Sequence, residues 1–133
     1  MAVIDASVYI ALINAHEKDH MTSWAWFEQA QAAREPIVAP VILLAEVAAA
    51  LSQGIGALLA HRVLGQLKHS RLIELVPVTL TMAERAAAIA ADQRIRSCDA
   101  IYVALADQSG DCLITLDRQQ LERSAAIVSA REP

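Results

Sequence analysis

Four acidic side chains, each at the edge of a strongly apolar segment, are the residues of this chain best suited to chemistry: Asp5, Glu46, Asp99 and Asp117. An isolated carboxylate is unfavourable in such a setting, because removing an ion from water carries a large desolvation cost. No Lys or Arg lies within these apolar runs to pair with the acids. Four acids that converge in one fold repel one another unless a cation holds them together. A hard divalent metal ion is the natural partner, and such a site points to phosphodiester chemistry.

The segments that carry these acids belong to an alternation of strands and helices. Strands are expected at 2–5, 37–39, 72–77, 112–116 and 126–129. Helices are expected at 6–14, 40–53, 56–70, 98–107 and 119–123, with one more around Trp24, Trp26 and Phe27 and another from 81 to about 95. Pro40 is expected to open its helix, Asp19 and Ser97 to cap theirs, and Thr81 to start a capping box. Strands that alternate with helices predict an α/β domain whose mainly parallel central sheet is flanked by helices.

The expected elements place the acids at comparable positions. In parallel α/β sheets, ligands bind beyond the carboxyl ends of the strands, at a switch in strand order. Asp5 and Asp117 both stand at the end of an expected strand. Asp99 stands at a helix N-terminus, where the helix dipole favours an acid, and Glu46 lies inside a helix. We therefore expect all four carboxylates to face one rim of the sheet.

Four segments together carry a resemblance to a known family: V-I-D-A-S-V at 3–8, P-V-I-L-L-A-E-V at 40–47, R-S-C-D-A-I-Y-V-A-L-A at 96–106 and L-I-T-L-D at 113–117. In order and spacing the chain resembles PIN-domain ribonucleases, and most closely the VapC-type toxins of bacterial and archaeal toxin–antitoxin pairs. The resemblance implies a PIN-like domain and an endoribonuclease that hydrolyses RNA with Mg²⁺ or Mn²⁺. It also implies a homodimer that a small cognate antitoxin neutralises.

The resemblance assigns roles to individual residues. It implies that Asp5, Glu46, Asp99 and Asp117 form the catalytic set; Asp5, Asp99 and Asp117 are the expected metal ligands. Glu46 is either a further ligand or the base for the attacking water. Ser7 and Thr115 match the positions of hydroxyl residues that orient the acids.

Each acid also has an ordinary structural interpretation. Asp5 and Asp117 could cap the helices that follow them, and Asp99 could simply start a helix. Glu46 could be a surface glutamate that reaches solvent. Tyr102, one turn beyond Asp99, is expected to pack in the core rather than to touch substrate.

Basic residues flank two of the acids. Arg96 and Arg118 either contact RNA phosphates or pair with neighbouring acids, and the sequence favours neither interpretation.

The composition limits the class of protein. The 133 residues fit one domain, 1–133, and the net charge of −4 argues against a nonspecific nucleic-acid coat. The longest apolar stretch, 36–51, is too short for a membrane span and is interrupted by Pro40 and Glu46. The N-terminus lacks a signal-peptide pattern, and Cys98 and Cys112 are expected to be reduced thiols. A cytoplasmic protein is therefore expected.

Two alternative functions compete with the ribonuclease. One is a catalytically silent PIN-like module that only binds RNA or a protein partner. The other is a phosphatase that uses Asp5 as nucleophile. The phosphatase is weakly supported, because Ser7 occupies the place of the second acid in the aspartyl-phosphate D-x-D pattern.

Overall fold

The computed structural model describes residues 1–54 and 56–133, and a five-stranded parallel sheet forms its centre. The strands are β1 (Ala2–Ile4), β2 (Ile37–Pro40), β3 (Glu74–Val76), β4 (Cys112–Ile114) and β5 (Ala130–Arg131). Their order across the sheet is β3-β2-β1-β4-β5, and every neighbouring pair is parallel. The predicted α/β class and parallel sheet are confirmed.

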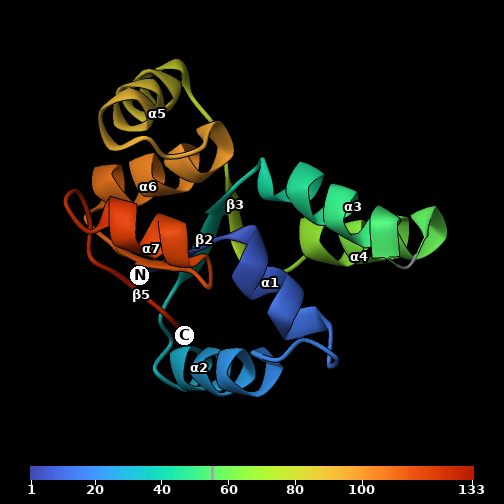
Figure 1. The fold of residues 1–133 in the computed structure, drawn as a ribbon. Helices are drawn as coiled ribbons and strands as arrows, with labels where there is room; N and C mark the ends of the chain where they lie inside the picture. The colour runs from blue at the N-terminus through green and yellow to red at the C-terminus, as the bar shows by residue number, and fades with distance from the viewer. Residues whose placement is uncertain (55) are drawn as a thin grey trace.

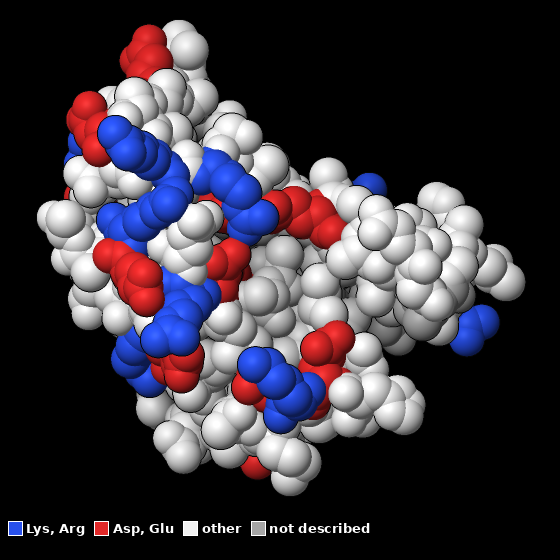
Figure 2. All heavy atoms as spheres, viewed as in Figure 1, with Lys and Arg blue, Asp and Glu red and all other residues white. Residues whose placement is uncertain are grey.

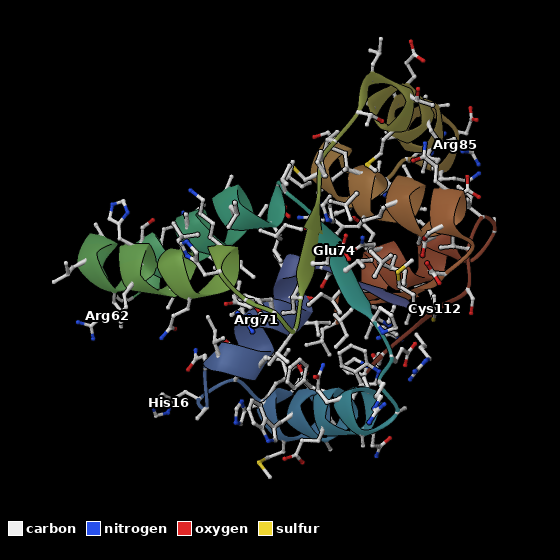
Figure 3. The ribbon with its side chains drawn as sticks, turned by 180° about the vertical axis from the view of Figure 1, so that it is seen from behind. His16, Arg62, Arg71, Glu74, Arg85 and Cys112 are labelled. Atoms are coloured by element: carbon white, nitrogen blue, oxygen red, sulfur yellow. The ribbon has the colours of Figure 1, made fainter. Side chains whose placement is uncertain are left out.

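The described residues also form seven helices. They are α1 (Ala6–Ile13), α2 (His20–Ala32), α3 (Leu43–Gly54), α4 (Ala57–Lys68), α5 (Leu80–Gln93), α6 (Ser97–Ser109) and α7 (Arg118–Ser124). Figure 1 shows α2 and α6 on opposite sides of the strands, while α3 and α4 form a helical hairpin that projects away from the sheet. From behind, Arg62 points outward from α4 near the far end of this hairpin (Figure 3).

The central strand is buried along its whole length. All three residues of β1 are at most 1% exposed, because β2 and β4 flank this strand and helices cover both faces. A strand covered on both faces reads as a continuous apolar run, as A-V-I does here. Helix α6 packs against β1, β2 and β4. The packing of α6 therefore fixes the first turn of this helix, and with it Asp99, relative to the ends of β1 and β4.

Two predicted caps were wrong. Helix α5 is capped by Thr79 instead of Thr81: its hydroxyl oxygen accepts a hydrogen bond from the Met82 amide at 3.2 Å. Thr79 has the extended backbone that a cap requires, whereas Thr81 already lies within the helix. At the start of α6, Ser97 is the first helical residue, and Arg96 takes the capping position without a side-chain cap.

Two predicted boundaries also shifted. Pro40 does not open α3 but ends β2, where it pairs with Val76, and the helix begins at Leu43. The last strand lies at 130–131 rather than 126–129, because Ser124 accepts hydrogen bonds from the amides of Ile127 and Val128. These bonds hold the chain in a turn after α7.

Trp24 and Phe27 share a face of α2, with ring centroids 5.8 Å apart. Together with Tyr9 and Leu12 they line an apolar groove of about 220 Å³ between α1, α2 and the end of α4. Trp24 remains 43% exposed, so part of this groove faces solvent.

Among the residues that the structure describes, no helix is long and apolar enough to cross a membrane.

Candidate functional site: an acidic pocket beyond β1 and β4

The structure brings all four predicted acids to one small cavity of about 110 Å³. Its lining consists of Asp5, Ala6, Ser7, Glu46, Arg96, Asp99, Tyr102 and Asp117, and we call it the acidic pocket. The pocket lies beyond the carboxyl ends of β1 and β4. Between these two neighbouring strands the order of the sheet changes direction, which is where parallel sheets bind ligands.

Asp5 and Asp117 line the pocket and cap helices at the same time. One carboxylate oxygen of Asp5 accepts a hydrogen bond from the Val8 amide at 3.1 Å, at the start of α1. One oxygen of Asp117 accepts from the Gln120 amide at 3.0 Å, at the start of α7. The structural and the chemical interpretations of these acids therefore do not exclude each other. Each cap uses only one oxygen of its carboxylate.

Asp5 is held by two hydroxyl groups on the floor of the pocket. Its side chain is 4% exposed. Ser7 Oγ donates to Oδ1 at 2.6 Å, and Thr115 Oγ1 donates to Oδ2 at 2.5 Å. Ser7 also accepts from the Leu116 amide at 3.0 Å, which ties the turn after β1 to the turn after β4. The two residues predicted to orient the acids thus contact Asp5 directly.

The surroundings of Asp5 raise its pKa above the ordinary value of 3.8. Burial is the main cause, and the nearby Asp99 carboxylate adds to it. The hydrogen bonds from Ser7, Thr115 and Val8 act in the opposite direction, since they stabilise the charged form.

Gln120 belongs to the same network, although no sequence pattern singles it out. It is 1% exposed, its side-chain oxygen lies 3.1 Å from Thr115 Oγ1, and its amide donates to the Asp99 carbonyl at 3.3 Å. Gln119 stands beside it in a helix that is polar apart from Leu121, so composition does not distinguish the two glutamines. Only the shared face with Ser124, four residues on and also buried, marks Gln120 as inward-facing.

Glu46 reaches the pocket from the first turn of α3 and receives a hydrogen bond from the Tyr102 hydroxyl. The pKa of Glu46 is raised, chiefly by burial and further by Asp99 and Asp5, whereas Tyr102 and Arg96 lower it. Burial and the Glu46 carboxylate raise the pKa of Tyr102, which keeps the phenol protonated. Tyr102 packs in the core as expected, at 1% exposure, but its hydroxyl also orients a pocket acid.

Arg96 joins the two remaining acids. Its Nε donates to Asp99 Oδ2 and its Nη2 to Asp117 Oδ2, both at 2.7 Å. The hydrogen bond to Asp99 is the main cause that raises the pKa of Arg96. The apolar runs contain no basic residue, yet the loop before α6 supplies one. Of the two interpretations of Arg96, pairing with neighbouring acids is the one that this arrangement displays.

Arg118 lies apart from the acidic pocket. Its side chain is 89% exposed, pairs with Glu122 at 3.3 Å, and lines a separate open groove with Lys18 and Arg131. Figure 2 shows Lys and Arg side chains in a band over the side where α6 and α7 lie, with acidic side chains between them. The α3–α4 hairpin is largely uncharged on this face.

The donor set of the acidic pocket suits a hard divalent cation, because carboxylate oxygens are the ligands that Mg²⁺ and Mn²⁺ prefer. As the side chains stand, no group of three or more His, Cys, Asp or Glu residues within 1–54 and 56–133 converges closely enough to hold an ion. In this arrangement, Asp99 and Asp117 each direct an oxygen to Arg96. The chemistry of the residues fits a metal, provided that these oxygens are released.

Solved structures with the same fold include proteins of toxin–antitoxin systems. The crystal structure of VapC20 from Mycobacterium tuberculosis, described as a sarcin–ricin loop cleaving toxin, matches with a TM-score of 0.79 and 22% identity over 100% of both chains. VapBC2 from Rickettsia felis, bound to a promoter DNA fragment, matches with a TM-score of 0.76 and 14% identity over 99% of this chain and 98% of that one. FitAcB from Neisseria gonorrhoeae matches with a TM-score of 0.73 and 16% identity over 100% and 98%. At these identities the likeness shows a shared fold.

The sequence comparison identifies the family itself. No curated protein matches the chain. The family model of the PIN domain, however, matches residues 2–126, which span every described element from β1 to α7. The chain belongs to the PIN domain family.

Proposed function

We propose that this protein is a metal-dependent endoribonuclease of the VapC toxin type, which a cognate antitoxin neutralises. The observation that carries the proposal is the convergence of Asp5, Glu46, Asp99 and Asp117 on one pocket at the switch point of a PIN fold. The similar fold of VapC20, a sarcin–ricin loop cleaving toxin, supports RNA as the substrate.

In the proposed reaction, the chain's residues position the substrate and move a proton. Asp5, Asp99 and Asp117 would hold Mg²⁺ or Mn²⁺, which supplies Lewis-acid activation of a water and neutralises charge at the phosphodiester. Ser7 and Thr115 keep Asp5 in one orientation through the hydroxyl contacts described above. Glu46, oriented by Tyr102, accepts the proton of the attacking water or serves as a further ligand. Its raised pKa brings it closer to the range in which a base both accepts and releases protons.

The proposed RNA contacts lie along the edge of the pocket. Arg96 lines the pocket and contacts Asp99 and Asp117, and Arg118 extends from the start of α7 into solvent. Guanidinium groups at these positions can bind two phosphates of one strand, since their planar fork matches phosphate oxygens. The phosphate role is a proposal for both residues, and RNA as substrate places the proposed activity in the cytoplasm.

A protein partner and a second copy of the chain complete the proposal. Several solved structures with this fold are toxin–antitoxin complexes, which supports a small antitoxin as partner. Exposed apolar side chains such as Trp24, Leu58 and Leu72 provide surface that a partner or a homodimer would cover. Light scattering of the chain alone and with the product of a small neighbouring gene measures both associations. A strict monomer that binds no such product would remove this part of the proposal.

The test of the function is RNA cleavage by the purified chain without a partner. Total RNA and a sarcin–ricin loop hairpin are incubated with Mg²⁺ or Mn²⁺, with EDTA, and with Asp99→Asn. We expect discrete products that disappear with EDTA and with the variant. A folded protein that binds RNA but cleaves neither substrate with either metal would favour the silent PIN-like module instead.

A further inference from the structure

Arg96 occupies the space between two acids that the proposed function assigns to a metal ion. The guanidinium contacts Asp99 and Asp117 through two different nitrogens, at 2.7 Å each, and both contacts use the Oδ2 atom. The other oxygen of Asp117 caps α7. Arg96 therefore holds the one oxygen of Asp117 that does not cap a helix, and one of the two oxygens of Asp99.

The exposure of the three side chains is unequal. Arg96 is 67% exposed, whereas Asp99 is 15% and Asp117 27% exposed. An exposed guanidinium can turn into water with little loss of hydration energy, and ion pairs of this kind contribute little stability. Asp117 is also held by its cap of α7, and Asp99 stands in the first turn of α6. The guanidinium is therefore the member of the group that can turn into solvent with the least change in burial.

We propose that Arg96 is a built-in counter-cation of the acidic pocket, which a divalent metal ion must displace from Asp99 and Asp117. Displacement moves the guanidinium to the rim, where it is free to contact an RNA phosphate. This inference rests on the proposed function only in taking the metal of that function as the displacing ion. It explains why the carboxylates line one pocket without converging as a cage.

The test is a calorimetric titration of Mn²⁺, without RNA, into wild type, Arg96→Ala, Arg96→Gln and Asp99→Asn. Removing Arg96 frees both Oδ2 atoms and removes a competing positive charge, so we expect both Arg96 variants to bind Mn²⁺ about tenfold more tightly. Asp99→Asn binds more weakly than wild type. Unchanged or weaker binding in both Arg96 variants overturns the proposal.

Arg118→Ala is the matched control, because it removes a positive charge near the start of α7 that contacts neither Asp99 nor Asp117. We expect its Mn²⁺ affinity to equal that of wild type; a gain as large as that of Arg96→Ala would reduce the effect to net charge and overturn the proposal. Arg96 makes no side-chain cap at α6, so its replacement leaves the helix start intact. Thermal unfolding verifies that the variants are folded.

A second measurement follows the side chain itself. In wild type, titration with Mg²⁺ should shift the NMR signal of the Arg96 Nε–H group, assigned by its loss in Arg96→Gln. A signal that stays in place while Mg²⁺ binds contradicts displacement. RNA cleavage by wild type is scored separately. If the Arg96 variants bind Mn²⁺ more tightly but wild type does not cleave RNA, the counter-cation role is upheld and the nuclease function is rejected. If wild type cleaves RNA but the Arg96 variants bind Mn²⁺ no more tightly, the nuclease function is upheld and the counter-cation role is rejected.

Discussion

The two sides of the acidic pocket hold their carboxylates by different means. On the buried side, Asp5 receives hydrogen bonds from two neutral hydroxyls and a backbone amide. On the exposed side, Asp99 and Asp117 share one guanidinium. Neutral donors fix the position of an acid but leave its charge in place. A cationic partner cancels charge, yet another cation can replace it.

This difference divides the work within the pocket. On the buried side, burial disfavours the charged form of Asp5 and raises its pKa, and only neutral donors offset this. The exposed side adapts its partner to what is present in solution. If Arg96 gives way to a metal ion on the exposed side, the pocket can bind the ion while the hydrogen bonds to Asp5 stay in place.

Replacing Asp5, the most buried of the four acids, removes the charge on the buried side of the acidic pocket and should have the largest effect on activity. Asp5→Asn keeps the size of the side chain but removes its charge, so RNA cleavage should fall at least about 10³-fold, on the scale of losing a central electrostatic group. Initial cleavage rates at saturating Mg²⁺ measure the loss. Asp92→Asn, an exposed acid on α5, is the control and should retain wild-type activity. A rate for Asp5→Asn within a few-fold of wild type, by the same assay, contradicts the assignment.

Removing the hydroxyl that orients Asp5 tests whether neutral donors matter to function. In Thr115→Val, Asp5 Oδ2 and the Asp117 amide both lose a partner. We expect cleavage to drop about 10- to 100-fold, as when an orienting partner of a ligand is lost. We also expect unfolding to become easier by about 1–3 kcal/mol, by urea titration. Thr115→Ser should restore most of both properties; if it behaves like valine, the hydroxyl is not the cause.

The Tyr102–Glu46 hydrogen bond gives a prediction about pH. Tyr102 lowers the pKa of Glu46, so Tyr102→Phe should raise it. If Glu46 must be ionised, the acid limb of the pH profile of kcat/KM moves to higher pH, and the rate on that limb falls about tenfold for each unit by which the pKa rises. Tyr9→Phe, which changes a buried tyrosine outside the pocket, is the control. An unmoved acid limb with full activity would remove Glu46 from the proton transfer.

Replacing Arg96 and Arg118 in turn tests how much each arginine contributes to RNA binding on the exposed side of the pocket. With Ca²⁺ in place of Mg²⁺, Arg96→Ala should weaken RNA binding several-fold and reduce the salt slope of the affinity by about one. Arg118→Ala should have a smaller effect, because its side chain lies farther from the acidic pocket. Fluorescence anisotropy at several salt concentrations measures both. Equal affinities for wild type and Arg96→Ala would leave Arg96 without a phosphate contact.

The smallest predicted effect concerns stability. The folded-state pKa of Asp5 lies above its ordinary value of 3.8, so folding favours the protonated acid. As pH rises from about 3.8 through the folded pKa, wild type loses stability that Asp5→Asn keeps. The variant should therefore unfold at a temperature equal to or slightly above that of wild type at neutral pH. The gap should close in acid. A variant that melts clearly lower at neutral pH would show that the charge of Asp5 stabilises the fold.

Much of the fold and part of the site follow from local sequence. Asp5 and Asp117 each follow an apolar run that predicts a strand, and both lie just beyond the ends of β1 and β4 in the structure. The sequence leaves pairing with neighbouring acids as one of two alternatives for Arg96, but it does not predict the bridge to Asp117, the contact of the Tyr102 hydroxyl with Glu46 or the role of Gln120. Each of them depends on a partner 21 or more residues away in the chain. Periodicity and propensity register neighbours in sequence, and they carry no information about such contacts.

The dual role of Asp5 and Asp117 as helix caps and pocket acids has a consequence for how this protein can change over time. Asparagine caps helices as well as aspartate does. Aspartate and asparagine codons differ by a single base in the first position. On the proposed function, one transition at either codon would therefore yield a chain that keeps the helix cap but loses a carboxylate of the acidic pocket. A single point mutation would then separate the proposed nuclease from a silent PIN domain.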